Sequence, residues 1–228
     1  MNEYSFFLGW GCIFAVLADL LERQLMTATV ASSDLRSAMI LASVRRAFME
    51  KGFDGASMQD LAREAGMSVG NFYRYFPSKA AMVEALIAGD IAELERDFSD
   101  IFSSADPMLR LRQTIKRHVE DSLCNGEGRL WAEITAVAMR KPEIATIVSQ
   151  METALIHHLT TVFSISSGLP LAEVVGQYSA HASFVMMMVM ASSMQACEAG
   201  TQQAALTALV LRTINQTLDE IPQMMLKG

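Results

Sequence analysis

The chain has 228 residues, of which 51% are hydrophobic and 19% are charged, and its formal net charge is −7. This composition excludes a disordered chain, and the negative charge argues against a nonspecific nucleic-acid binder. Helix-forming residues are abundant while the chain holds only 13 glycines and 5 prolines, so we predict an all-α fold. The three cysteines, Cys12, Cys124 and Cys197, are widely spaced, which predicts free thiols in a reducing cytoplasm.

The charge is unevenly distributed along the chain. The segment from Asp34 to Met82 carries seven basic and five acidic side chains, which leaves −9 for the rest. A locally basic segment on an acidic body is typical of a protein that places one face against phosphates. We therefore look for a DNA-binding unit in this segment.

The N-terminal segment from Ser5 to Leu21 is almost wholly apolar, and Asp19 is its only charged residue. Its length is near the lower limit of roughly 17 residues for a membrane span. No Lys or Arg precedes it, which argues against a secretory signal. Residues 1–30 are thus an apolar extension with three interpretations: a membrane anchor, an extra amphipathic helix, or a mis-assigned start upstream of Met26. We favour the last, and we expect no membrane partner.

The first predicted helix covers about residues 34–51. Its apolar side chains recur every four residues, which is typical of a helix buried along one face: Ile40, Val44 and Phe48. Gly52 follows in the position of a left-handed cap and is expected to end the helix.

Three serines are predicted to begin the next three helices. Ser57 is followed by Asp60 at the spacing of a capping box, in which both side chains accept hydrogen bonds from free backbone amides. Ser68 begins a second short helix, which stops before Pro77 because proline disfavours helical geometry in the preceding residue. Ser78 then begins the fourth helix.

Residues 57–76 therefore form a helix, a turn at Gly66 and a second short helix, which is the spacing of a helix-turn-helix. The second helix leaves polar groups outside its apolar stripe: Ser68, Asn71, Tyr73, Arg74 and Tyr75. Hydroxyl, amide and guanidinium groups on one exposed helix face suit contacts with DNA phosphates and base edges. Lys79 at the start of the next helix adds a candidate phosphate partner. The alternative is a small helical bundle whose tyrosines merely pack.

The run SMQDLAREAGMSVGNFYRYFPSKAAMVEAL, residues 57–86, resembles the DNA-binding signature of the TetR family of transcriptional regulators. The resemblance covers about residues 34–90, and beyond them it extends only to length and helical character. It implies an N-terminal three-helix helix-turn-helix domain (31–80) and a larger helical domain for effector binding and dimerisation (81–228). By position it implies DNA contacts from these residues: Ser57, Ser68, Gly70, Asn71, Tyr73, Tyr75 and Lys79. Arg74 stands where many relatives have histidine, and its longer side chain should still reach a phosphate.

The last two predicted helices, about residues 171–197 and 201–220, are strongly apolar. The helix over about 171–197 is apolar on nearly all sides from Phe184 to Met194. The helix over about 201–220 has an apolar side chain at every fourth residue: Leu206, Val210, Ile214 and Leu218. A helix that is apolar all round lies at the centre of a domain or is shared with a second subunit. We expect a homodimer through these two helices, which would present two reading helices to a palindromic operator.

The same half of the chain is expected to bind a small molecule. Large apolar side chains that would suit an adaptable cavity are Trp131, Met139, Met151, Phe163, Phe184 and Met187. The ionisable groups expected to meet a polar ligand head are His157, His158 and His181.

No nucleophile–base pair, phosphate loop, acid pair or metal motif stands out in the sequence. We therefore expect no catalytic residues, metal or cofactor, and no enzyme. The function expected is a cytoplasmic regulator of transcription, a repressor that an apolar or amphipathic ligand releases from double-stranded DNA. The alternatives left open are an activator, a regulator without ligand response, an enzyme and a membrane-anchored sensor.

Overall fold

The computed structural model describes residues 36–122, 127–194 and 201–223. Every regular element within these ranges is a helix, which confirms the all-α prediction. The apolar extension at 1–30 and the three cysteines lie outside the described residues.

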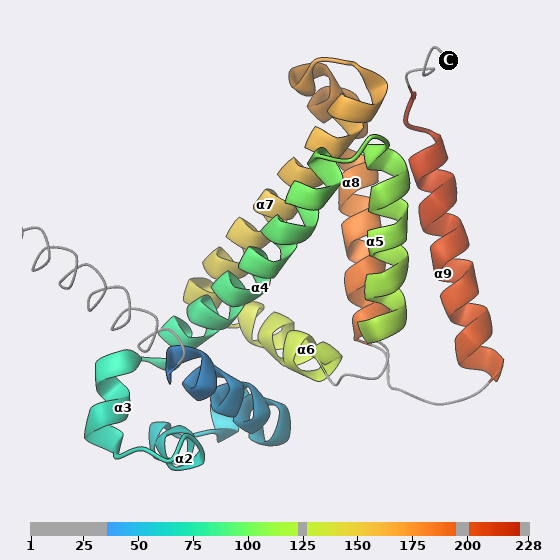
Figure 1. Cartoon of the computed structure of the whole chain (residues 1–228). Coiled ribbons are helices and arrows are strands. Elements are labelled where there is room, and N and C mark those ends of the chain that lie inside the picture. The colour runs from blue at the N-terminus through green and yellow to red at the C-terminus, as the bar shows by residue number, and fades with distance from the viewer. Residues whose placement is uncertain (1–35, 123–126, 195–200, 224–228) are drawn as a thin grey trace, which may run out of the picture.

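A small domain lies at one end of the molecule (Figure 1). It consists of a helix over residues 36–55, α2 (Met58–Glu64), α3 (Val69–Tyr75) and the first turns of α4 (Lys79–Phe102). Phe48 and Phe72 are fully buried at its centre, where the helices cross. Burying two phenylalanine rings supplies several kcal/mol at about 25 cal/mol per Å² of apolar surface, a large share of the stability of a unit this small.

The predicted helix starts are confirmed. The Ser57 hydroxyl accepts from the backbone N–H of Asp60 at 3.1 Å, and the Asp60 carboxylate accepts from the backbone N–H of Ser57 at 3.2 Å, which completes the capping box. The hydroxyls of Ser68 and Ser78 likewise accept from the backbone N–H groups of Asn71 and Ala81 at the starts of α3 and α4. Gly52 has φ +73°, as its role as a cap requires, although the helical hydrogen bonding continues through residue 55.

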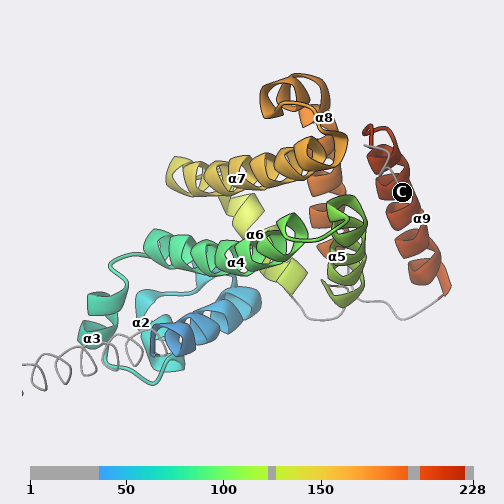
Figure 2. The same ribbon diagram turned by 45° about the horizontal axis from the view of Figure 1, so that its top comes forward.

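The large domain contains the remaining helices: α5 (Pro107–Ser122), α6 (Glu127–Ala138), α7 (Pro142–Ser167), α8 (Leu171–Ser193) and α9 (Thr201–Asp219). The helix α7 runs along α4, and α5 and α9 stand beside α8 (Figures 1 and 2). The helix α6 lies between these long helices and the small domain (Figure 1).

Two apolar cores share α4. Its N-terminal half contributes Leu86 and Ile87 to the core of the small domain, and its C-terminal half contributes Phe98 and Ile101 to the core of the large domain. Residues of α6 and α7 also enter the first core, so the two domains are joined by continuous packing. The predicted boundary at residue 80 falls at the second residue of α4.

Candidate functional site

The helix α3 is held by its aromatic residues and leaves its other side open. Phe72 is fully buried and Phe76 is nearly so, with their ring centroids 6.2 Å apart. On the outer side Tyr73 is 46% exposed, and Arg74 is exposed beside it. A Cβ added to Gly70 would meet nothing within 4 Å. The structure therefore presents a short polar helix face to a partner, as the helix-turn-helix interpretation requires.

The other residues predicted to contact DNA are partly buried or are already hydrogen-bonded within the protein. Asn71 and Tyr75, which also belong to α3, are half-buried. The Ser57 hydroxyl both donates to the Asp60 carboxylate, at 2.6 Å, and accepts from its backbone N–H. The Ser68 hydroxyl accepts from the backbone N–H of Asn71 at 3.4 Å. Both serines thus begin helices, and a phosphate contact from Ser57 competes with its capping box.

Lys79 has a structural role that the sequence did not indicate. Its ammonium donates to the backbone carbonyl oxygens of Phe53, of Asp54 at 3.4 Å and of Ala56 at 3.0 Å. It also lies 4.8 Å from the centre of the Phe53 ring. Burial lowers the pKa of Lys79, an effect that nearby Asp54 opposes. Because an ammonium has three N–H donors, these carbonyls engage all of them, and Lys79 ties α4 to the C-terminal end of the first helix.

The large domain contacts the same segment, residues 52–56, through side chains of its own. The carboxylate of Glu133 in α6 accepts from the backbone N–H of Phe53 at 2.7 Å. Arg140 and Lys141, at the turn between α6 and α7, pair with Asp54 at 3.3 and 3.4 Å. The end of the first helix, residues 52–56, is thus a polar contact between the two domains. These residues look like ordinary surface charges in the sequence, and only the tertiary structure shows their partners.

A cavity of about 230 Å³ lies within the large domain, among α4, α5, α7 and α8. Of the six predicted ligand-binding residues, Trp131 and Met151 line it. The other four, Met139, Phe163, Phe184 and Met187, do not line this cavity. Met139 and Met187 are 86% and 56% exposed.

Phe163 and Phe184 do not reach the cavity either. Phe163 is fully buried in the core of the large domain, and Phe184 is half-buried on α8. Helical periodicity shows which side chains are apolar, but not which neighbouring helix each one faces. That is why the cavity lining could not be read from the sequence.

The polar lining of the cavity was not predicted, apart from one histidine. It consists of Asp90, Glu93 and Asp97 on α4, Thr114 and His118 on α5, His158 on α7 and Ser193 on α8. His158 stacks on Phe98, with ring centroids 4.8 Å apart. Burial, together with the adjacent His157, lowers the pKa of His158 below its usual 6.5, so the imidazole is neutral at pH 7.

The other two histidines that the sequence analysis proposed for a ligand head do not line the cavity. His157 is exposed on α7, and His181 lies 3.0 Å from the carboxylate of Glu220 at the end of α9. Within the described ranges, no group of three His, Cys, Asp or Glu side chains is placed to hold a metal ion.

Comparison with known proteins matches residues 40–86 to the family described as bacterial regulatory proteins, tetR family. The transcriptional regulator EthR of Mycolicibacterium smegmatis is 40% identical over 87 residues, which are 37% of this chain and 40% of EthR. The chain thus spans less than half the length of this relative.

Solved structures share the whole fold. GusR of Salmonella enterica superposes with a TM-score of 0.65 at 21% identity, covering 82% of this chain and 94% of GusR. AibR, solved in complex with isovaleryl coenzyme A and operator DNA, gives a TM-score of 0.60 at 17% identity, covering 83% of this chain and all of AibR. At these identities the likeness concerns the fold.

Proposed function

Because this chain belongs to the TetR family of bacterial regulatory proteins, we propose that it is a sequence-specific regulator of transcription that binds double-stranded DNA. The family consists of regulators and not of enzymes. The observation that carries the proposal is the open face of α3, where Tyr73, Arg74 and Gly70 project from a rigidly packed unit. A short helix held this way fits a major groove, and its polar side chains suit phosphate and base contacts.

A homodimer through α8 and α9 is part of the proposal. The helix α8 has a mean hydropathy of 1.3 over its most apolar stretch, yet only 17% of that stretch is buried. Its exposed residues include a row of apolar ones, most of them small, at Ala172, Gly176, Ala180, Met187 and Ala191; Glu173, Val175 and Gln177 are exposed beside this row. On α9, Leu206 and Leu209 are 36% and 47% exposed. Exposed apolar helices of this kind are typical of a subunit interface.

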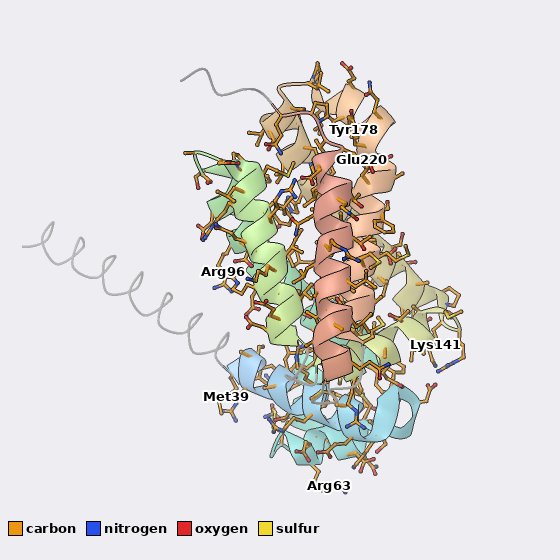
Figure 3. All side chains as sticks on the ribbon, turned by 90° about the vertical axis from the view of Figure 1, so that its right-hand side faces the viewer. Met39, Arg63, Arg96, Lys141, Tyr178 and Glu220 are labelled. Carbon is orange, nitrogen blue, oxygen red and sulfur yellow. The ribbon has the colours of Figure 1, made fainter. Side chains whose placement is uncertain are left out.

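The two helices form one surface. His181 of α8 meets Glu220 after α9, and Tyr178 packs edge-on against the His181 ring. Figure 3 shows Tyr178 and Glu220 at one end of the molecule and Arg63, of α2, at the other. A second copy on this surface would hold two α3 helices to DNA, which a palindromic operator requires.

By length and composition α8 also meets the criteria for a membrane span. We prefer a second subunit as its cover because α8 packs against α5, α7 and α9 within a helical domain that also carries the cavity.

The cavity supports a role in effector binding. It is lined mainly by apolar side chains with a few polar groups, as small-molecule sites usually are. We therefore propose a cytoplasmic repressor whose apolar or amphipathic ligand favours a conformation with lower DNA affinity.

Selection of bound sequences from a random double-stranded DNA pool tests the DNA-binding proposal. The full chain should enrich a palindrome, and its affinity should fall steeply as salt rises, because binding releases counterions. Tyr73→Ala and Arg74→Ala should each weaken binding by about 1–3 kcal/mol. Arg96→Ala is the matched control, since Arg96 is an exposed residue far along α4 (Figure 3). No enriched site with a folded dimer would refute the proposal.

Sedimentation equilibrium tests the dimer. A Cβ at Gly176 of α8 or at Gly89 of α4 would meet nothing within 4 Å of the same protomer. Gly176→Leu should therefore leave the protomer folded but shift it to a monomer, while the control Gly89→Leu should stay dimeric. A Gly176→Leu dimer of unchanged affinity would exclude this interface.

A further inference from the structure

The carboxylates of the cavity lie together on one face of α4. Asp90, Glu93 and Asp97 follow each other at spacings of three and four residues, which places them on adjacent turns of the same side. Their side chains are 28%, 77% and 38% exposed. The apolar walls are buried, for example at Met151 and Leu159. The cavity is therefore acidic on its solvent side and apolar within.

The lining contains two histidines, His118 and His158, besides its carboxylates. Among the described residues that line the cavity there are three carboxylates and no Lys or Arg. His158 is neutral at pH 7 for the reason given above. An anionic ligand head would thus meet negative oxygens at the solvent side, while a cationic head would be attracted to them. Trp131 and Phe98 also line the cavity, and aromatic faces attract cations.

All three carboxylates already meet arginines that lie outside the lining: Glu93 lies 3.8 Å from Arg96, and the other two acids are held more closely. Arg117 of α5 bonds both oxygens of Asp97 at 2.9 Å. Arg45 bonds Asp90 at 2.6 Å, and this pair is only 22% and 28% exposed. A carboxylate has about four lone-pair sites, so either acid can accept from a second cation beside its arginine.

The Asp90 pair links the cavity to the small domain. Arg45 belongs to the helix over residues 36–55, and Asp90 lies on α4 where that helix crosses from one core to the other. The carboxylate of Asp90 therefore serves both the cavity and the DNA-binding domain. Any cation that draws this carboxylate inward weakens its bond to Arg45.

We infer that the cavity takes an organic cation with an apolar body, and that its positive group competes with Arg45 for Asp90. The inference rests on the proposed function in treating the cavity as the effector site. It specifies the charge of the effector head and the first contact that binding changes. An anionic coenzyme A ester, such as the ligand in the AibR structure, would be disfavoured by the acidic side of this cavity.

Three probes with the same phenylbutyl body separate the alternatives: 4-phenylbutylammonium, 4-phenylbutan-1-ol and 5-phenylpentanoate. Binding is followed by the fluorescence of Trp131 in the full chain with Trp10→Phe, since these are the two tryptophans of the chain. The rise in Tm with ligand concentration gives a second readout. We expect the ammonium to bind about tenfold or more tightly than the alcohol, as charge-assisted hydrogen bonds predict, and the carboxylate to bind most weakly.

Glu93→Gln and Asp90→Asn should each remove most of the preference for the ammonium while leaving the affinity for the alcohol unchanged. Glu84→Gln is the matched control, because Glu84 is an exposed residue of α4 that does not line the cavity. Equal binding of ammonium and alcohol, or tighter binding of the carboxylate, would overturn the inference.

Competition with Arg45 has its own signature. Arg45→Met removes the competing cation and should raise the affinity for the ammonium several-fold, with no change for the alcohol. If Arg45→Met does not fold, Arg45→Lys should raise the affinity for the ammonium by a smaller factor, because lysine binds a carboxylate less tightly than the forked guanidinium of arginine does. An affinity for the ammonium that neither variant changes would refute the competition.

The outcomes also separate this inference from the proposed function. A protein that selects an operator but prefers the alcohol or the carboxylate remains a regulator with a different effector. A protein that binds the ammonium but selects no operator keeps the cavity inference and loses the DNA-binding proposal.

Discussion

The carboxylate of Glu133 accepts a hydrogen bond from the backbone N–H of Phe53 at 2.7 Å, across the contact between the two domains. Two residues before Glu133 on α6, Trp131 lines the cavity. The same turn of α6 thus carries a residue of the cavity wall and a residue that bonds the C-terminal end of the first helix of the DNA-binding domain. A displacement of α6 by a ligand would act on this bond directly.

Glu133→Ala should destabilise the protein by about 1–3 kcal/mol, because the N–H of the buried Phe53 loses its acceptor. Glu133→Gln retains an oxygen acceptor and should lose less. Urea denaturation of both variants measures the difference. Equal stability of Glu133→Ala and the unchanged protein would show that water replaces the carboxylate.

Lys79→Met should lower the stability of the protein in the absence of DNA by about 1–3 kcal/mol, because three carbonyl oxygens lose a charged donor. Thermal or urea unfolding of the free protein checks this. The control is Lys116→Met, since Lys116 is 63% exposed on α5. If Lys79 served only as a phosphate contact, its replacement would lower DNA affinity and leave the unfolding free energy unchanged.

Gly128→Ala should be strongly destabilising. An added Cβ would lie 1.7 Å from the carbonyl oxygen of Ser193 and 2.6 Å from its carbonyl carbon, so the start of α6 would have to move away from the end of α8. Overpacking against backbone costs about 1–3 kcal/mol or more. Gly89→Ala in α4, where a Cβ meets nothing within 4 Å, should be neutral or slightly stabilising. Similar Tm values for the two variants would contradict the close approach.

Asp60 should make the stability of the small domain sensitive to acid. Hydrogen bonds from the hydroxyl and the backbone N–H of Ser57, with Lys51 nearby, hold the pKa of the Asp60 carboxyl well below its usual 3.8. In the unfolded chain the group protonates first, so its stabilisation is complete above the unfolded pKa and is lost as pH falls below it.

Asp60→Asn should therefore reduce the dependence of stability on pH between about pH 5 and pH 3. Urea midpoints of the two proteins across that range provide the measurement. Parallel curves would mean that the capping carboxylate has the same pKa in both states.

The parts of the structure that follow from neighbouring residues could be predicted from the sequence. Ser57 with Asp60, Ser68 and Ser78 begin their helices as expected, because a cap depends on the next three residues. Gly52 has the left-handed backbone that its position indicated.

Contacts between distant elements could not be predicted in the same way. Met139 and Phe163 looked equally suitable for a cavity, yet one is exposed and the other is buried in a core. The spacing of Asp90, Glu93 and Asp97 along α4 was visible in the sequence, but it indicates a site only once the facing helices are known. The resemblance implied a phosphate contact for Lys79 and did not indicate that the free protein uses its ammonium on carbonyl oxygens.

The two cores draw on separate stretches of α4, with Leu86 and Ile87 in one and Phe98 and Ile101 in the other. Substitutions at cavity walls that belong to the second core, such as Phe98 and Leu159, can therefore accumulate without altering the packing beneath α3, whereas Met151 lines the cavity and belongs to the first core. A lineage with this architecture can keep its DNA target while it changes the compound it responds to. Asp90 both lines the cavity and bonds Arg45 of the small domain, so substitutions at this position would be the most constrained.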